Sequence, residues 1–222
     1  MEPKSNIAAF FDFDETIIDI NSSKVGFKWL YENKMLSKWF ILKVIITGML
    51  YEANLISEKH MADGMVIFYK GKKLSFFSDR AEKFYNDLLK PHLIPQIVDK
   101  IRYHKDRGHI LVIVSGSIRY YLEPVARDLG FDHLVCTELE EGVDGLLTGK
   151  PKSHICLGKN KQLMTIDLVN KLKINLDESY AYGNSQADIH LLKMVGNPTA
   201  VEPNLPLKKV AIKNNWPILR FK

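Results

Sequence analysis

The sequence lacks the features of an exported, fibrous or low-complexity protein. It contains no internal repeat, and its 222 residues, 46% hydrophobic and 26% charged, are typical of an ordinary soluble globular chain. Its first six residues are polar and lead directly into an apolar strand-like segment, not into a signal peptide. We therefore expect a protein that is not exported, with one core and a cap or small second domain.

Cysteine is scarce, and basic residues are not clustered. Cys136 and Cys156 are too few for a disulfide framework and lack metal-ligand spacing, so we expect reduced thiols in a cytoplasmic protein. The net charge of +5 comes from lysine and arginine scattered through every predicted helix, with no basic run that alternates with aromatics. This argues against nucleic acid as a partner. The basic excess suits an anionic small substrate or weak attraction to anionic lipid.

Two carboxylates stand at the end of an apolar run. Residues 7–11 read as a buried strand, Asp12 and Asp14 follow with one phenylalanine between them, and Thr16 comes two residues later. Burying unpaired carboxylates costs several kcal/mol each, which indicates a cationic or reactive partner. The pattern fits a site for a phosphoryl group and a hard cation such as Mg²⁺. For an isolated Asp-x-Asp, an acidic turn that caps a helix is the alternative interpretation.

From residue 90 onward, short apolar runs alternate with amphipathic stretches, which is typical of a parallel α/β sheet. Asp144-Gly145 is read as the turn of a small hairpin. The predicted strands cover residues 109–114, 134–137, 180–182 and 199–201, and the predicted helices cover residues 95–107, 118–129 and 160–173.

Residues 20–90 contain no convincing strand and show four helical stretches, punctuated near Asn33, Asn54 and Gly71. We interpret them as a helical insertion that closes over the carboxyl edge of the sheet as a cap. Residues 39–51 are apolar almost all round, yet too short to span a bilayer. We expect this helix to be buried in the cap or at a subunit contact, with an interfacial membrane contact as the alternative.

Three further segments place polar residues at strand ends or a helix start. Ser115 and Gly116 follow the second predicted core strand, Lys161 begins a helix, and Asn184 and Asp188 follow a later strand. Each has an ordinary explanation when taken alone: a turn, a solvated lysine, an exposed helix residue. Their common position at one sheet edge, together with the Asp-x-Asp motif, indicates a single site.

These motifs resemble the haloacid dehalogenase (HAD) superfamily of phosphohydrolases, and the tail segments 179–185, 200–204 and 216–219 resemble its subfamily IB, the relatives of phosphoserine phosphatase. The resemblance covers residues 7–219, least closely in the cap. It implies a Rossmann-like α/β core, residues 1–19 and 91–222, with an all-helical cap inserted after the first strand, residues 20–90.

The resemblance also implies an aspartyl-phosphate mechanism that depends on Mg²⁺. Asp12 would be the nucleophile and Asp14 the general acid and base. Lys161 would be catalytic through its charge and would contact the phosphoryl group, as would Thr16, Ser115 and Gly116. The metal ligands would be Asp12, Asp14 through its carbonyl, Asn184 and Asp188.

The chain departs from the family pattern at two positions of the core. Asn184 replaces the usual aspartate of the fourth motif, which removes one charge from the metal site, and Asp188 is expected to compensate. Glu15 replaces a usual glycine or serine, and we expect its side chain to face outward.

Phosphoserine is disfavoured as a substrate. Asn21 and Ala62 occupy the positions where phosphoserine phosphatases carry an acidic residue and an arginine, and neither can form the required ion pair. Lys59 and His60 remain candidate cap contacts. Trp29, Tyr31 and the run that begins at Trp39 indicate an apolar cap and favour a phosphate ester with apolar bulk, either a small molecule or a lipid derivative.

Two alternatives to a phosphatase stay open at this point. One is a catalytically weak protein that binds a phosphate or metabolite, and the other is a membrane-surface protein that uses its apolar cap helix. The sequence leaves the oligomeric state undetermined.

Overall fold

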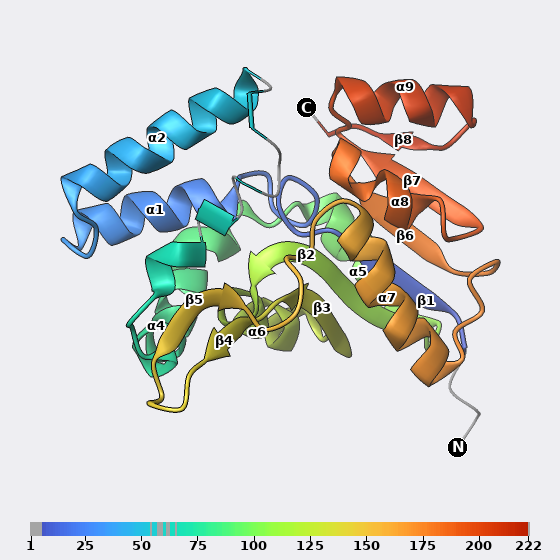
Figure 1. The fold of residues 1–222 in the computed structure, drawn as a ribbon. Helices are drawn as coiled ribbons and strands as arrows, with labels where there is room; N and C mark the ends of the chain where they lie inside the picture. Colours follow the sequence, from blue (N-terminus) through green and yellow to red (C-terminus); the bar gives the residue numbers. More distant parts are fainter. Residues whose placement is uncertain (1–5, 54, 57–59, 61–62, 65, 222) are drawn as a thin grey trace.

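The computed structural model describes residues 6–53, 55–56, 60, 63–64 and 66–221. Its centre is a six-stranded parallel sheet in the order β3-β2-β1-β6-β7-β8 (Figure 1). This confirms the predicted α/β class. The strands are β1 (Ala8–Phe11), β2 (Ile110–Ile118), β3 (His133–Thr137), β6 (Tyr180–Gly183), β7 (Asn197–Val201) and β8 (Ile218–Leu219).

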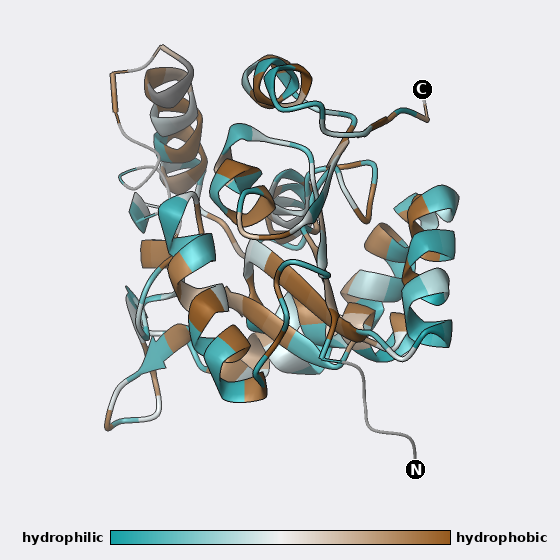
Figure 2. Cartoon of the chain, turned by 90° about the vertical axis from the view of Figure 1, so that its right-hand side faces the viewer, coloured by the Kyte–Doolittle hydropathy of each residue, from teal (hydrophilic) through white to brown (hydrophobic). Residues whose placement is uncertain are grey.

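Side chains along the central strand β1 alternate between two hydrophobic cores, because successive residues of a strand point to opposite faces. Ala9 and Phe11 pack in one core with residues of α5 (Pro95–Asp106) and α6 (Arg119–Leu129). Ala8 and Phe10 pack in the other, with residues of α7 (Lys159–Leu172), α8 (Ile189–Leu192) and α9 (Leu205–Lys213). Figure 2 shows hydrophobic strands between these layers of helix.

The described part of residues 20–90 is helical, as predicted. Asn33 caps the end of the first helix, Gly71 occupies a left-handed turn with φ of 74°, and Asn54 lies outside the described residues. The elements are α1 (Ser22–Glu32), α2 (Lys38–Glu52), the 3₁₀ turn η1 (Ile67–Tyr69), α4 (Leu74–Phe84), the π-helical turn η2 (Tyr85–Leu89) and the 3₁₀ turn η3 (Lys90–His92).

A two-stranded hairpin from the second half of the chain docks against the helical insertion. Its strands β4 (Leu139–Glu141) and β5 (Leu147–Pro151) are antiparallel, and Asp144-Gly145 lies between them as predicted. The Leu147 carbonyl accepts from Gly71 N at 2.8 Å, and Leu147 N donates to the Lys72 carbonyl at 2.8 Å. The division into a core and a helical cap stays a prediction, but the hairpin joins the two regions.

Helix α2 is not buried by the cap. Its Trp39 residue is 81% exposed and its Met49 residue 64% exposed, which corrects the expectation of burial in the cap, whereas burial at a subunit contact stays a prediction. Within the described residues, no helix is both long and apolar enough to cross a membrane. Cys136 and Cys156 are buried free thiols, as predicted.

Candidate functional site

Asp12 and Lys161 form a buried ion pair at the carboxyl end of β1. The Lys161 ammonium lies 2.5 Å from Asp12 Oδ1 and 2.6 Å from Asp188 Oδ1, and all three residues are at least 95% buried. The Thr16 hydroxyl donates to Asp12 Oδ2 at 3.2 Å. One lysine, delivered by the first turn of α7, therefore holds two carboxylates that are 176 positions apart in the chain, at residues 12 and 188.

Asp188 is fixed by the backbone that follows β6. Its second oxygen, Oδ2, accepts from Asn184 N at 3.1 Å, from Ser185 N at 3.0 Å and from Ser185 Oγ at 3.2 Å. A Cβ on Gly183 would lie 2.6 Å from Asp188 Cβ, so only glycine fits there. Both Asp188 oxygens accept from protein donors, Lys161 among them, and the metal-ligand role expected of Asp188 stays a prediction.

Asp14 has its own set of donors, separate from those of Asp12. Ser22 N, at the start of α1, donates to Asp14 Oδ1 at 2.5 Å, and the Ser117 hydroxyl donates to Oδ2 at 2.9 Å. The Ser22 and Ser117 hydroxyls are 3.1 Å apart. These contacts orient Asp14 without Lys161, so the two carboxylates of the Asp-x-Asp motif have different environments.

Burial raises the pKa values of the acidic side chains of the site and, taken alone, lowers that of its lysine. Burial raises the pKa of Asp12, and the Asp188 charge raises it further, whereas Lys161 lowers it. Burial also raises the pKa of Asp14, against hydrogen bonds from Ser22 and Ser117 that lower it. Burial alone would lower the pKa of Lys161, but the two carboxylates beside it raise that pKa. Lys161 therefore stays charged, and burial raises the pKa of both carboxylates of the Asp-x-Asp motif, that of Asp12 to about 7.

Ser115 and Gly116 lie at the same edge, within the last residues of β2. Ser115 is 1% exposed, and its oxygen accepts from Ser117 N at 3.1 Å. A Cβ on Gly116 would lie 2.6 Å from the Leu157 side chain, so a larger residue here would require Leu157 to shift. Both residues line one cavity with Asp12, Asp14 and Lys161.

Asn184 contacts the second residue at which the chain departs from the family pattern. Its amide Nδ2 donates to Glu15 Oε2 at 3.0 Å. Glu15 is an exposed residue, but its carboxylate reaches Asn184 and it lines the cavity, which corrects the expectation that its side chain faces outward. Its backbone is left-handed with φ of 56°, a conformation that favours glycine. Because a carboxylate only accepts, the amide nitrogen faces Glu15 and the amide oxygen faces away from it.

The charges of the site fit a hard cation. Asp12, Asp14 and Asp188 are three carboxylates of a largely buried site, and among the described residues Lys161 is the only ammonium paired with any of them, contacting Asp12 and Asp188. Among the described residues, no three His, Cys, Asp or Glu side chains are grouped to hold a metal ion. The ligands predicted for a cation here, Asp12, the Asp14 carbonyl, Asn184 and Asp188, all offer oxygen atoms, which Mg²⁺ accepts.

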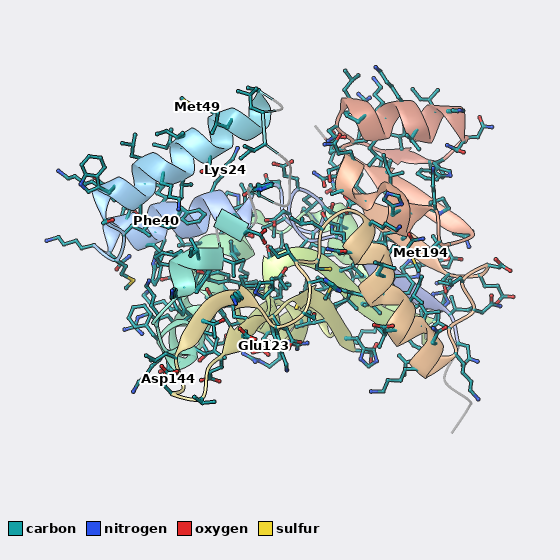
Figure 3. All side chains as sticks on the ribbon, in the orientation of Figure 1. Lys24, Phe40, Met49, Glu123, Asp144 and Met194 are labelled. Atoms are coloured by element: carbon teal, nitrogen blue, oxygen red, sulfur yellow. The ribbon has the colours of Figure 1, made fainter. Side chains whose placement is uncertain are left out.

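These residues form the floor of a cavity of about 430 Å³ whose walls come from the helical insertion and from core residues such as Ile155 and Leu157. Figure 3 shows Phe40 pointing from α2 toward α1, and its ring lies 6.3 Å from that of Phe27. The lysines Lys24 and Lys43 also line the cavity. The apolar wall includes Phe27, Leu30, Phe40, Val44, Ile155 and Leu157.

Several contacts were not visible in the sequence. The sequence does not indicate that Ser22 and Ser117 contact Asp14. For Ser117, its position two residues after Ser115 is the one local signal. Asn21 lines the cavity, but its side chain caps α1 by accepting from Lys24 N at 3.1 Å. His60 is exposed, whereas Lys59 and Ala62 lie outside the described residues.

Comparison with known proteins agrees with this geometry. The family model for haloacid dehalogenase-like hydrolases matches residues 9–193. The chain is 28% identical over 217 residues to an inhibition of morphological differentiation protein from Streptomyces azureus, covering 96% of this chain and 78% of that protein. It is also 28% identical to a probable phosphatase from Mycobacterium tuberculosis, covering 99% and 77%. A histidinol-phosphatase from Neisseria meningitidis is 25% identical, covering 96% and 98%.

Solved structures share the fold. A protein with unknown function from Bordetella pertussis superposes with a TM-score of 0.87 at 23% identity, covering 97% of this chain and 99% of that one. A phospho-aspartyl intermediate analogue of phosphoserine phosphatase superposes with a TM-score of 0.67 at 19% identity, covering 97% and 93%. The chain therefore belongs to the haloacid dehalogenase-like hydrolase family and is one of its phosphatases.

Proposed function

We propose that the chain is a Mg²⁺-dependent phosphomonoester hydrolase that acts through an aspartyl-phosphate at Asp12. The observation that carries this proposal is the separation of the two carboxylates. Asp12 is held by Lys161 and Thr16, whereas Asp14 is held by Ser22 and Ser117. A nucleophile and a proton donor require different environments. Asp12 and Asp14 follow the same strand with one residue between them, and their environments differ in this way.

In the first step, a carboxylate oxygen of Asp12 attacks phosphorus, and the bond between phosphorus and the ester oxygen breaks. Asp14, whose pKa is raised by burial, gives its proton to the leaving oxygen. In the second step, Asp14 takes a proton from a water molecule that attacks phosphorus. Inorganic phosphate leaves, and the Asp12 carboxylate is restored.

The remaining residues hold the phosphoryl oxygens. The Ser115 hydroxyl, the main chain at Gly116 and the Lys161 ammonium line the cavity beside Asp12, and they would donate to the charge that develops on those oxygens. Mg²⁺, when bound by Asp12, the Asp14 carbonyl and Asn184, neutralises charge between the carboxylates and the phosphate.

The walls of the cavity favour a phosphate ester with an apolar body. Both α1 and α2 contribute aromatic and aliphatic side chains to these walls, together with Lys24 and Lys43. Asn21 accepts from the backbone of its own helix and carries no charge for a substrate amino group. We therefore favour alkyl, aryl or lipid-derived phosphates over phosphoserine, in a cytoplasmic enzyme.

Hydrolysis of p-nitrophenyl phosphate tests the reaction class. Purified protein should release nitrophenol with Mg²⁺ and lose this activity with a chelator, and Asp12→Asn should abolish it. A matched variant, Asp177→Asn, alters an aspartate outside the cavity and should keep full activity. Inactivity of the wild type across a broad panel of phosphate esters would contradict the proposal.

A series of alkyl phosphates tests the substrate class. The kcat/KM should rise with chain length, by about threefold per added methylene while the chain fills the cavity. Phosphoserine should be hydrolysed less well than a butyl phosphate. Equal kcat/KM values along the series would overturn the apolar substrate but not the phosphatase chemistry.

A further inference from the structure

Helix α2 carries a stripe of large apolar side chains that faces solvent. Trp39, Leu42, Ile45, Ile46 and Met49 are between 45% and 81% exposed. At 100° per residue, these five positions fall within one face of the helix. Figure 3 shows Met49 on the side of α2 that faces away from α1. We call these five residues the outer stripe.

The opposite side of α2 is already in use. Phe40, Val44, Thr47 and Gly48 line the catalytic cavity, and the Phe40 ring packs against Phe68 at 5.2 Å. The helix is therefore apolar on both sides, one covered by the cap and one open to water. A helix that is apolar all round is ordinarily covered on every side. The described residues of the chain thus leave the outer stripe uncovered.

The charges around the outer stripe identify what kind of surface would cover it. Among the described side chains of α2, the only charged ones are Lys38 and Lys43. Lys38 falls on the same helix face as the stripe, and the exposed Lys34 precedes it in the turn from α1. Trp39, the most exposed large apolar residue of the helix, stands beside these lysines, as aromatic side chains do at membrane interfaces.

A second copy of the chain fits this pattern less well than an anionic surface. Self-association through the outer stripe would remove Lys38 from water without bringing an acidic side chain described on this helix to meet it. Anionic lipid headgroups would instead pair with Lys34 and Lys38 while the apolar stripe enters the headgroup and acyl boundary.

We propose that the outer stripe of α2 docks the protein on an anionic lipid surface. The helix has 15 residues and is about 22 Å long at 1.5 Å per residue, shorter than the hydrocarbon core of a bilayer, so it lies in the interface. The same helix walls the catalytic cavity, so docking would place the cavity next to amphiphilic phosphates. The docking needs no catalysis, whereas this delivery of substrate rests on the proposed function.

Flotation with lipid vesicles tests the docking directly. Wild-type protein should float with phosphatidylcholine vesicles that contain about a third phosphatidylglycerol, and about tenfold less with phosphatidylcholine alone. Ile46→Glu should reduce binding to the anionic vesicles by about tenfold or more. Its matched control is Ile212→Glu, which changes an isoleucine of α9 that is 60% exposed and should leave binding unchanged.

A second pair of variants tests the charge. Lys38→Glu should weaken binding to anionic vesicles by about tenfold, whereas Lys209→Glu, at an exposed lysine of α9, should not. Added salt should weaken wild-type binding in the same direction. Equal loss with the stripe variants and the α9 controls would overturn the proposal, as would failure of the wild type to bind either kind of vesicle.

Two further measurements distinguish lipid docking from the phosphatase activity and from self-association. Ile46 does not line the cavity, so Ile46→Glu should keep the wild-type melting temperature and its turnover of p-nitrophenyl phosphate in the absence of vesicles. Docking therefore fails or succeeds independently of the phosphatase activity. Light scattering without lipid should show the same mass for wild type and Ile46→Glu. A wild-type dimer that Ile46→Glu dissociates would assign the outer stripe to self-association and overturn lipid docking.

Discussion

The Asn184 amide nitrogen donates to the Glu15 carboxylate at 3.0 Å, although 169 positions separate the two residues. The family pattern that this chain resembles usually has glycine or serine at the first position and aspartate at the second. Here the pair instead has a carboxylate at residue 15 and an amide at residue 184. Relative to that pattern, the negative charge lies on residue 15 and not on residue 184, and the contact directs the amide oxygen away from Glu15.

Replacing Glu15 should weaken Mg²⁺ binding without weakening the fold. In Glu15→Gly, the Asn184 amide loses its orienting acceptor, and the Mg²⁺ dissociation constant should rise by about tenfold. The melting temperature should not fall comparably, because residue 15 has a left-handed backbone that suits glycine. Calorimetric titration with Mg²⁺ in the absence of substrate measures the first effect, and a thermal melt measures the second.

Two related variants control this experiment. Glu15→Gln retains an oxygen acceptor for the Asn184 amide, so it should lose less Mg²⁺ affinity than Glu15→Gly. Asn184→Asp alone should gain little, because it places a second carboxylate beside Glu15. The double change Glu15→Gly with Asn184→Asp should bind Mg²⁺ most tightly. Unchanged affinity in Glu15→Gly would show that the contact does not orient Asn184.

Removing the buried lysine should destabilise the protein strongly. Lys161→Met leaves Asp12 and Asp188 as uncompensated buried carboxylates, so the free energy of unfolding should fall by about 3–5 kcal/mol. Adding Asp188→Asn should recover part of that stability but no activity, since Asp12 still lacks its ammonium. Urea denaturation and a phosphatase assay on the same samples distinguish the two effects. Equal stability of the single and double variants would argue against the shared ion pair.

A buried histidine outside the site predicts a pH dependence of stability. His104 is fully buried, its Nε2 lies 2.9 Å from the Tyr182 hydroxyl, and burial followed by the charge of His109 lowers its pKa from 6.5 to about 4. The unfolded state therefore binds the proton more readily. This contribution to stability is complete above pH 6.5 and is lost as the pH falls toward 4.

Urea denaturation at several pH values checks this expectation. The free energy of unfolding of the wild type should fall more between pH 7 and pH 5 than that of His104→Gln, because the variant lacks the lowered pKa of His104. His154→Gln, which changes an exposed histidine, should follow the wild type. Parallel curves for the wild type and His104→Gln would contradict the assignment.

The sequence predicted the sheet edge because parallel strands bring their carboxyl ends together. Asp12, Ser115 and Asn184 each follow an apolar run, and such runs are recognisable without any tertiary information. Lys161 was placed by its position at a helix start. These four residues line one cavity in the structure, and the expected hairpin turn at Asp144-Gly145 is also present.

What the sequence did not predict depends on contacts between distant segments. The pairing of Glu15 with Asn184 and that of Ser117 with Asp14 require the register of separate strands, which no local pattern encodes. Nor does local patterning show that both carboxylate oxygens of Asp188 accept hydrogen bonds from protein donors. The exposure of α2 was missed because hydrophobic content alone does not distinguish a buried helix from one that presents an apolar face to solvent.

Trapping of the phosphorylated enzyme tests the central claim most directly. Asp14→Asn should still be phosphorylated by an aryl phosphate, whose leaving group needs no proton, but should lose the base that activates water, so the intermediate should accumulate. After an acid quench with ³²P-labelled substrate, the label should map to the peptide that contains Asp12 and should be released by hydroxylamine. The Asp12→Asn variant should carry none. Label that resists hydroxylamine, or label on another residue, would contradict the aspartyl-phosphate mechanism.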